Sequence, residues 1–330
     1  MKKTEILYIP LLFLIIYTVY FNPPSLGLLS YIFYLTIGGF VLVKGSDVFI
    51  EGAVSIAARL GVSEHTIGLT VVAFGTSVPE LAVSVIAAFQ GHTETAWGNV
   101  LGSNTTNILL VLGAAMILMP LKPSKYAYHD SLYMILVSAV TLCLALEGSL
   151  QFYDGIVLLI LYGIFIYMLW KREEIEEEES CDATLGFVLS VVYIVFGAMG
   201  VASGADAVVE GAVGISRLLG VSEVAIAASI VALGTSLPEL MTSIMATIKK
   251  YHGIAVGNVV GSNIVNLGVV LGASAVIRNI PMDIMSPAVI FFGVSALLTA
   301  LILKKKYLSK ISGTIFLTLY VLFLFFLYIF

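Results

Sequence analysis

Apolar stretches long enough to cross a membrane recur along almost the entire chain and are separated by short polar breaks. A helix needs about 20 mostly apolar residues to cross a hydrocarbon core of ~30 Å. The pattern therefore predicts an all-α integral membrane protein with ten or eleven spans. The expected spans are residues 5–21, 28–58, 64–90, 95–119, 127–146, 153–170, 184–217, 222–248, 252–279, 285–303 and 311–330.

Composition agrees with this pattern, because 59% of the 330 residues are hydrophobic and only 11% are charged. So little polar surface would not cover a water-soluble globule of this size. The two cysteines, Cys143 and Cys181, cannot build a disulfide framework or a cysteine metal site. Much of the net charge of −5 comes from glutamates in residues 173–179. It indicates no nucleic-acid partner, and the expected partners are ions and membrane lipid.

The ends of the apolar stretches predict how the chain is organised. Residues 1–25 form either an additional N-terminal helix or a signal segment, and the long apolar stretch without a clear cleavage site favours the helix. Residues 26–170 and 184–330 are expected to be two repeats, joined by an acidic connector at 171–183.

Lysine and arginine positions predict the orientation, since cytoplasmic loops of membrane proteins retain positive charge. With the N-terminus inside, most of these residues fall in the cytoplasm, Arg217 and Arg278 fall outside, and Lys44 lies within a span. We therefore expect a multi-pass protein of the cell (plasma) membrane, with its N-terminus and acidic connector in the cytoplasm.

An internal repeat runs through both halves. Residues 70–84 read TVVAFGTSVPELAVS and residues 229–243 read SIVALGTSLPELMTS, an offset of 159 residues that also aligns GNVLGSNTTN at Gly98 with GNVVGSNIVN at Gly257. Four other spans lie between the two Glu-bearing spans, so the second copy enters the membrane from the opposite side. The sequence thus predicts two inverted-topology repeats of five transmembrane helices, an arrangement found in many secondary transporters.

The GTSxPE motif carries the candidate chemistry. A glycine and a proline in the middle of an apolar span interrupt the helical hydrogen bonds and free backbone carbonyls at membrane depth. Thr76 and Glu80 are four residues apart and share a helix face, and Thr235 and Glu239 repeat this arrangement. A carboxylate at the bilayer centre costs about 2.5–3.5 kcal/mol on insertion scales, and no basic residue at corresponding depth is available to pair with it.

Two such carboxylates at the repeat interface, surrounded by hydroxyl, amide and carbonyl oxygens, match a hard cation such as calcium, which prefers 6–8 oxygen ligands. A purely structural kink, with Thr and Ser bonding back to the helix, is the alternative for a single copy, and the inverted second copy disfavours it. In the GNVxGSNxxN segments we expect the glycines Gly98, Gly102, Gly257 and Gly261 to allow close helix packing. Asp47 and Asp206, in the long spans, are expected at a rim or vestibule.

These duplicated motifs resemble the alpha repeats of the sodium/calcium exchanger branch of the cation/calcium exchanger superfamily, from about residue 28 onward. The resemblance implies ten core helices, four cation sites at mid-membrane, and alternating access by sliding of the two long helices that contain Asp47 and Asp206. Carried over by motif, the implied ligands are Thr76, Ser77, Glu80, Ser103, Asn107, Thr235, Ser236, Glu239 and Ser262, with the backbone carbonyls of Ala73 and Ala232. Asn266, also an expected ligand, stands where relatives commonly have an aspartate.

The expected function is secondary antiport of sodium against calcium by a single chain, with both cations competing for the acidic site and with no cofactor. Proton- or other-cation-coupled calcium exchange is the first alternative, although the acidic residue typical of proton/calcium exchangers after GNA is missing from both GNV segments. A cation channel is the second, because oxygen-lined broken helices also build filters. An enzyme is not expected, since no His or Lys is placed to activate Ser77 or Ser236.

Overall fold

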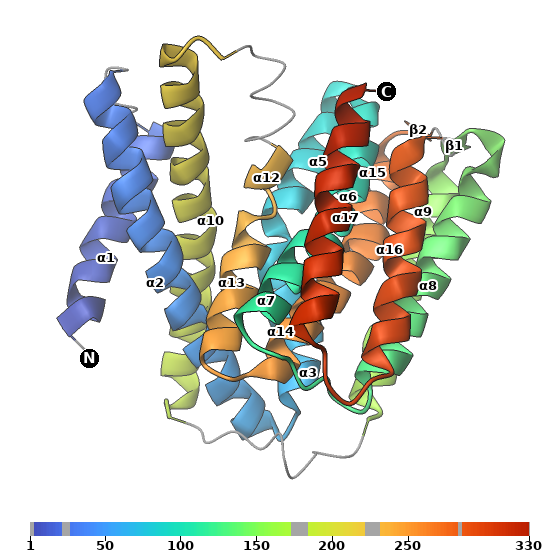
Figure 1. Ribbon diagram of the computed structural model, residues 1–330, viewed down its shortest axis with the longest axis horizontal. Coiled ribbons are helices and arrows are strands. Elements are labelled where there is room, and N and C mark those ends of the chain that lie inside the picture. The colour runs from blue at the N-terminus through green and yellow to red at the C-terminus, as the bar shows by residue number, and fades with distance from the viewer. Residues whose placement is uncertain (1–2, 22–26, 173–183, 222–231, 283–285, 330) are drawn as a thin grey trace.

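The computed structural model describes residues 3–21, 27–172, 184–221, 232–282 and 286–329, most of them in helices that run up or down one common direction (Figure 1). The glutamate-rich part of the acidic connector, including Cys181, lies outside the described residues. So do residues 222–231 and 283–285, where two of the predicted spans begin.

The described part of the first half contains thirteen helical segments, some of them short pieces of one span. These are α1 (Lys3–Ile16) with η1 (Tyr17–Phe21), then α2 (Leu28–Leu60), α3 (Glu64–Ile67), η2 (Gly68–Val72), α4 (Ala73–Thr76), α5 (Val78–Gln90), α6 (Thr93–Thr106), η3 (Asn107–Leu112), α7 (Gly113–Leu118), α8 (Ala127–Leu144), η4 (Ala145–Glu147) and α9 (Phe152–Trp170). η1, η2 and η3 have the wider π-helical hydrogen bonding, and η4 is a 3₁₀ turn.

The second half repeats this order. Its described elements are α10 (Phe187–Leu218), α12 (Ala232–Gly234), α13 (Leu237–Ile248), α14 (His252–Val265), the π-helical η7 (Asn266–Leu271), α15 (Gly272–Ile277), α16 (Pro287–Leu303) and α17 (Lys310–Ile329). Two short strands, β1 (Ser149–Leu150) and β2 (Ile280–Pro281), pair antiparallel at one end of the bundle. They place the loop after α8 beside the loop after α15.

Length and apolar composition fit a membrane protein. Within the described residues, six helices are long and apolar enough to span a bilayer, and the bent pair Glu64–Thr76 and Val78–Gln90 makes a seventh if it is counted as one span. The prediction of an all-α, multi-pass membrane protein is confirmed.

The two halves run in opposite directions. In Figure 1, α2 descends from the upper end of the molecule, whereas its counterpart α10 climbs from the lower end. Likewise α5 ends at the top and α13 ends at the bottom, near the end where the N-terminus lies. The predicted inverted-topology repeats are therefore confirmed, and the antiparallel order brings equivalent pieces of the two halves together at the middle of the bundle.

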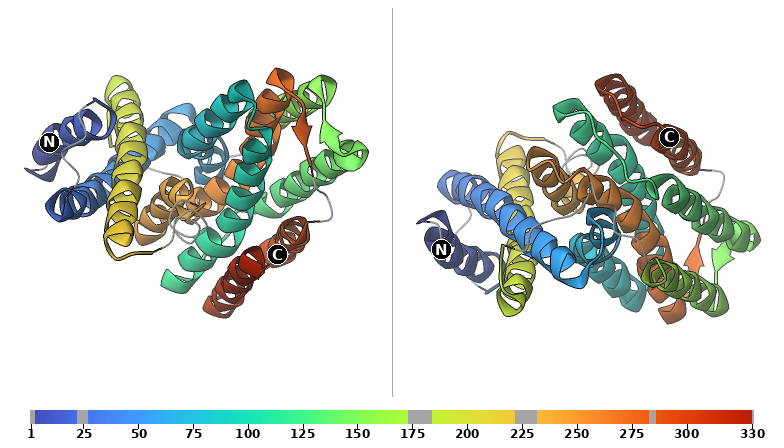
Figure 2. Two further views of the ribbon diagram at one scale, coloured as in Figure 1. Left: turned by 90° about the horizontal axis from the view of Figure 1, so that it is seen from above. Right: turned by 90° about the horizontal axis from the view of Figure 1, so that it is seen from below.

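The long helices α2 and α10 form a separate layer at one side of the bundle (Figures 1 and 2). They approach closely because glycines face the partner backbone: a Cβ at Gly197 would lie 2.6 Å from the backbone N of Phe49, and one at Gly204 would lie 2.5 Å from that of Leu42. The additional N-terminal helix α1 packs on both, with Tyr8 donating a hydrogen bond of 2.6 Å to the carbonyl of Phe196.

The centre of the molecule is built from the spans that follow the Glu-bearing helices. In the α6–α7 and α14–α15 spans, 78% of the most apolar window is buried, against 33% in α2 and α10 and 22% in α9. The buried spans carry the GNVxGSNxxN segments, while the remaining helices surround them and leave apolar side chains exposed, as lipid-facing helices do. The candidate polar site thus lies inside protein rather than against lipid.

Candidate cation site at the centre of the inverted repeats

Both GTSxPE motifs break their spans at the serine. Ser77 separates α4 from α5 with φ −86° and ψ 4°, and Ser236 precedes α13 with φ −91° and ψ 2°. The proline that follows each serine lies in the first turn of the new helix, where its missing N–H costs no hydrogen bond. In the first half the two helical pieces are bent by 46°. The motif therefore starts a new helix in each repeat.

Glu80 and Glu239 lie in the first turns of α5 and α13, and both are 0% exposed. Ser77 of the first repeat donates to Glu239 Oε1 at 3.2 Å, and Ser103 donates to Glu80 Oε1 at 3.5 Å. Ser77 directly precedes the helix that carries Glu80, so its hydrogen bond links the two carboxylate-bearing turns. Among the described residues no basic side chain pairs with either, so two buried acidic groups from opposite repeats share one region.

Thr76, Ala73 and Ser262 form a second group of oxygens next to these carboxyls. Thr76 Oγ1 lies 3.3 Å from the carbonyl of Ala73 and 3.5 Å from Ser262 Oγ. Ser262 Oγ also lies 3.5 Å from the Ala73 carbonyl. Residues from α4 and from α14 therefore meet across the repeat interface.

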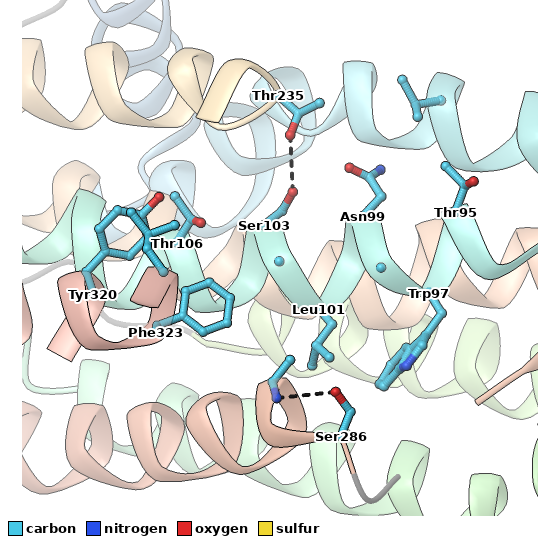
Figure 3. A pocket seen from close by; sticks show the side chains of 15 residues that line it. Thr95, Trp97, Asn99, Leu101, Ser103, Thr106, Thr235, Ser286, Tyr320 and Phe323 are labelled. Atoms are coloured by element: carbon cyan, nitrogen blue, oxygen red, sulfur yellow. Dashed lines mark hydrogen bonds between the residues drawn. The ribbon is translucent and has the colours of Figure 1, made fainter. Parts of the chain in front are cut away.

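The equivalent group of the second repeat is described only in part. Thr235 Oγ1 lies 3.4 Å from Ser103 Oγ, and both residues reach the wall of a cavity of about 490 Å³ (Figure 3). The wall of that cavity is mostly apolar and includes the aromatic side chains of Trp97, Tyr320 and Phe323. Ser236 is 1% exposed, and Ala232 begins α12, although its side chain lies outside the described residues.

Asn107 and Asn266 occupy equivalent places at the start of the π-helical turns η3 and η7. Both side chains are 0% exposed. π-helical turns are rare in proteins, and many of those that occur inside α-helices lie at functional sites. The two asparagines therefore bring one amide from each repeat into the buried polar region.

Five buried oxygens of this region have no hydrogen-bond partner among the described residues. They belong to Glu80 (Oε2), Glu239 (Oε2), Asn107 (Oδ1), Asn266 (Oδ1) and Ser236 (Oγ). Leaving a buried acceptor unsatisfied costs about 1–3 kcal/mol, and more for a charged group, so such atoms call for a ligand. All five belong to ligands expected from sequence, whereas a further buried oxygen without a described partner, Thr242 Oγ1 on α13, does not. Two carboxylates with neutral oxygens suit a hard cation.

The chemistry of the donor set also limits the class of ion. No group of three or more His, Cys, Asp or Glu side chains able to hold a metal occurs among the described residues. The candidate ligands are all oxygens, and calcium accepts carboxylate, hydroxyl, amide and carbonyl oxygens as ligands.

Asp47 and Asp206 lie apart from these oxygens, on the long helices. Asp47 pairs with Lys44 of its own helix at 2.5 Å and with Lys249 at the end of α13. Asp206 accepts a hydrogen bond from Tyr20 of the N-terminal segment. Each aspartate is thus engaged with its own partners, in keeping with a role outside direct ligation.

The motif glycines behave differently in the two repeats. A Cβ at Gly257 would lie 2.6 Å from the carbonyl of His65, and one at Gly261 would lie 2.6 Å from that of Leu69, so these two glycines do allow close packing. No described atom lies within 4 Å of a Cβ built at Gly98 or Gly102, so the packing role expected of these two glycines stays a prediction.

Sequence reasoning missed the asparagines that support the glutamates. Asn99 Nδ2 donates to the Glu80 carbonyl at 3.2 Å and to Ser84 Oγ at 2.9 Å. Asn258 repeats this with the Glu239 carbonyl at 3.4 Å and with Ser243 Oγ at 2.9 Å. The signal was present, because the Asn of GNV and the Ser four residues after each Glu recur at the same offset in both repeats.

Comparison with known proteins gives the same assignment as the motifs. Residues 30–171 and 189–329 match the family described as sodium/calcium exchanger protein. An uncharacterized membrane protein of Methanocaldococcus jannaschii is 35% identical over 88% of this chain and 95% of its own length. The sodium/calcium exchanger MaX1 of Methanosarcina acetivorans is 31% identical over 88% of this chain and 96% of its own length.

A solved structure shares the fold. The sodium-calcium exchanger NCX_Mj, soaked with 10 mM Na⁺ and zero Ca²⁺, superimposes with a TM-score of 0.81 at 33% identity, over 90% of this chain and 98% of that one. Family, relatives and fold agree with the inverted repeats and with the duplicated motifs. The chain is therefore a transport protein rather than an enzyme, and it belongs to the sodium/calcium exchanger family.

Proposed function

We propose that this protein is a secondary antiporter that exchanges sodium for calcium across the cell membrane as a single chain. The observation that carries the proposal is the pair of fully buried carboxylates, Glu80 and Glu239, each with one oxygen left without a described partner. Two negative charges balance one calcium ion or two sodium ions, so either cargo removes the cost of burying the pair. Both cations then compete for the same oxygens.

The ligand set consists of oxygens from both repeats. Glu80, Thr76, Ser77, Ser103 and Asn107 supply side-chain oxygens from the first repeat, with the carbonyl of Ala73. The second repeat supplies Glu239, Thr235, Ser236, Ser262 and Asn266, with the carbonyl of Ala232. The hydrogen bonds that cross between the repeats, such as Ser77 to Glu239, support this assignment. Partial overlap of sodium and calcium ligands within this set accounts for competition.

Alternating access is the transport mode that an inverted repeat supports best, because two similar halves of opposite orientation can exchange conformations. Here α2 and α10 form a layer held together by close glycine contacts, and that layer can slide as one unit along the bundle that holds the site. Each position opens the site to one side of the membrane. The cytoplasmic side is the end where the N-terminus lies, as the lysine and arginine distribution favours.

Calcium uptake into proteoliposomes tests the function. The purified chain is reconstituted with sodium, potassium, lithium or a proton gradient as the only outward driving force. We expect uptake with sodium inside and little uptake with the other three, together with competitive inhibition by external sodium. Uptake that needs no counter-ion would indicate a channel, and uptake driven by protons alone would indicate a proton/calcium exchanger. Either result would overturn the proposal.

A further inference from the structure

A chain of buried amides lies behind the candidate cation site and has no role in the ligand set. Asn104 and Asn263 are equivalent residues of the two GSN segments, and both are 0% exposed. Each contacts an expected ligand of the opposite repeat. Asn266 Nδ2 donates to Asn104 Oδ1 at 3.0 Å, and Asn107 Nδ2 donates to Asn263 Oδ1 at 3.4 Å.

The two supporting asparagines are themselves anchored, which fixes the direction of every hydrogen bond. Asn104 Nδ2 donates to the backbone carbonyl of Asn263 at 3.3 Å. Asn263 Nδ2 donates to the sulfur of Met134 at 3.4 Å. Because each nitrogen points toward those acceptors, Asn104 and Asn263 turn their oxygens toward Asn266 and Asn107. Those oxygens accept hydrogen bonds and cannot donate them.

This arrangement determines which end of each ligand amide faces the site. With Nδ2 held by a neighbouring oxygen, Asn107 and Asn266 must turn Oδ1 the other way, and these are two of the buried oxygens without a described partner. An asparagine side chain that is free to rotate by 180° would otherwise place an NH₂ group against the cation. A donor in that place would repel the cargo instead of binding it.

We propose that Asn104 and Asn263 are positioning residues that hold the amides of Asn266 and Asn107 with their oxygens toward the cation. The inference rests on the proposed function, because it assumes that a cation occupies the site. It also explains how Asn266 serves as an oxygen ligand without adding charge. Each repeat orients the ligand of the other, so the site is complete only when the two repeats are packed together.

Double-mutant cycles in the full-length protein test the inference. The variants are Asn104→Leu, Asn266→Leu and their combination, and Asn263→Leu with Asn107→Leu forms the second pair. Asn99→Leu with Asn266→Leu is the control pair, because Asn99 bonds Glu80 and Ser84 and shares no hydrogen-bond partner with Asn266 among the described residues. The measurement is the calcium concentration that half-protects the purified protein against thermal unfolding, which reports binding even where transport is lost. Sodium-driven calcium uptake is recorded in parallel.

We expect Asn104→Leu to weaken calcium binding roughly threefold to tenfold, the range for one lost hydrogen bond. In the Asn266→Leu background, Asn104→Leu should not weaken calcium binding further. In the Asn107→Leu background, Asn263→Leu should likewise have no further effect on calcium binding. The two effects of the control pair, Asn99→Leu and Asn266→Leu, should instead multiply. A merely structural role would weaken binding equally in both backgrounds, and that outcome would overturn the inference.

Two controls keep the test decisive. If Asn104→Leu does not give a monodisperse protein with a cooperative unfolding transition, Asn104→Ala replaces it in the same cycle with the same expected pattern. If the wild-type protein binds calcium and takes it up in response to a sodium gradient while the Asn104 variants bind calcium equally well, that result overturns the positioning role alone. A wild-type protein that neither binds calcium nor exchanges it overturns the proposed function, and the inference with it.

Discussion

At the scale of single residues, the neutral side chain of Asn266 keeps the charge of the site at that of the two glutamates, Glu80 and Glu239. Asn266 Nδ2 faces Asn104 Oδ1 at 3.0 Å, so an aspartate here would set a carboxyl oxygen against another acceptor. The two oxygens repel unless the carboxyl carries a proton and donates it to the amide oxygen. A third carboxyl beside Glu80 and Glu239 would also titrate together with them rather than independently.

Asn266→Asp should therefore make calcium exchange depend on pH near neutrality and should change its sodium dependence. Asn266→Leu should weaken transport at every pH, because it removes an oxygen without adding a titratable group. Sodium-driven uptake measured from about pH 6 to pH 8 compares the two variants with the wild type. Unchanged sodium and pH dependence in both variants would show that Asn266 only packs.

The sequence pointed to candidate ligands but not to the side chains that contact them. Glu80 and Glu239 stood out because an unpaired carboxylate in an apolar span is costly, and the sequence alone shows that neither span holds a basic residue at the same depth. The contact of Asn104 with Asn266 joins residues 162 positions apart, and only the packing of the repeats creates it. His65 is a similar case: it lies near a span end, yet the fold buries it 3.0 Å from Asp130.

At the scale of elements, the layer formed by α2 and α10 depends on glycine at the helix crossing. A Cβ on Gly204 would lie 2.5 Å from the backbone N of Leu42 and 2.9 Å from the Gly38 carbonyl, and backbone atoms cannot turn away as a side chain can. Gly39 lies on the same helix as Leu42, and no described atom is within 4 Å of its Cβ position. The two glycines therefore form a matched pair for substitution.

Gly204→Ala should lower the free energy of unfolding by about 1–3 kcal/mol, the usual cost of overpacking, and should slow transport by separating the two helices. Gly39→Ala should leave stability unchanged or raise it slightly, since alanine is the better helix former. Thermal unfolding in detergent and calcium uptake measure both effects. Equal stability of the two variants would contradict the close α2–α10 contact.

Span boundaries illustrate what hydrophobic length does and does not determine. The expected spans 28–58 and 95–119 correspond to α2 at Leu28–Leu60 and to the α6–α7 span at Thr93–Leu118. The length of an apolar stretch predicts a helix well in a membrane protein, because each span must satisfy its own backbone hydrogen bonds in lipid. The π-helical turns at Asn107 and Asn266 left no mark in the hydrophobic pattern, because they change the hydrogen bonding within a span and not its length.

At the scale of the whole molecule, the inverted repeat predicts where equivalent positions lie. Gln90 ends α5 and Lys250 follows α13, and both side chains are exposed. Lys250 already carries a side chain at φ 68°, so cysteine adds no new strain there. With Cys143 and Cys181 replaced by serine, Gln90→Cys and Lys250→Cys give single reactive sites at opposite ends.

A membrane-impermeant maleimide should label Gln90→Cys on intact cells and Lys250→Cys only after permeabilisation. Labelling of both sites from one side would contradict the inverted topology. The reversed pattern, with only Lys250→Cys labelled from outside, would preserve the fold and contradict the proposed orientation of the N-terminus. The measurement therefore tests the inverted topology and the orientation of the N-terminus separately.

The claim on which the whole account depends is that two carboxylates, one from each repeat, hold the transported ion together. Sodium-driven calcium uptake in Glu80→Gln and Glu239→Gln tests it directly, with Glu94→Gln as the control, since Glu94 is an exposed glutamate in the first turn of α6. Each site variant leaves a divalent ion with one compensating charge, so uptake should fall to the background of empty vesicles in both. The control should transport like the wild type. Wild-type uptake by either site variant would contradict the account.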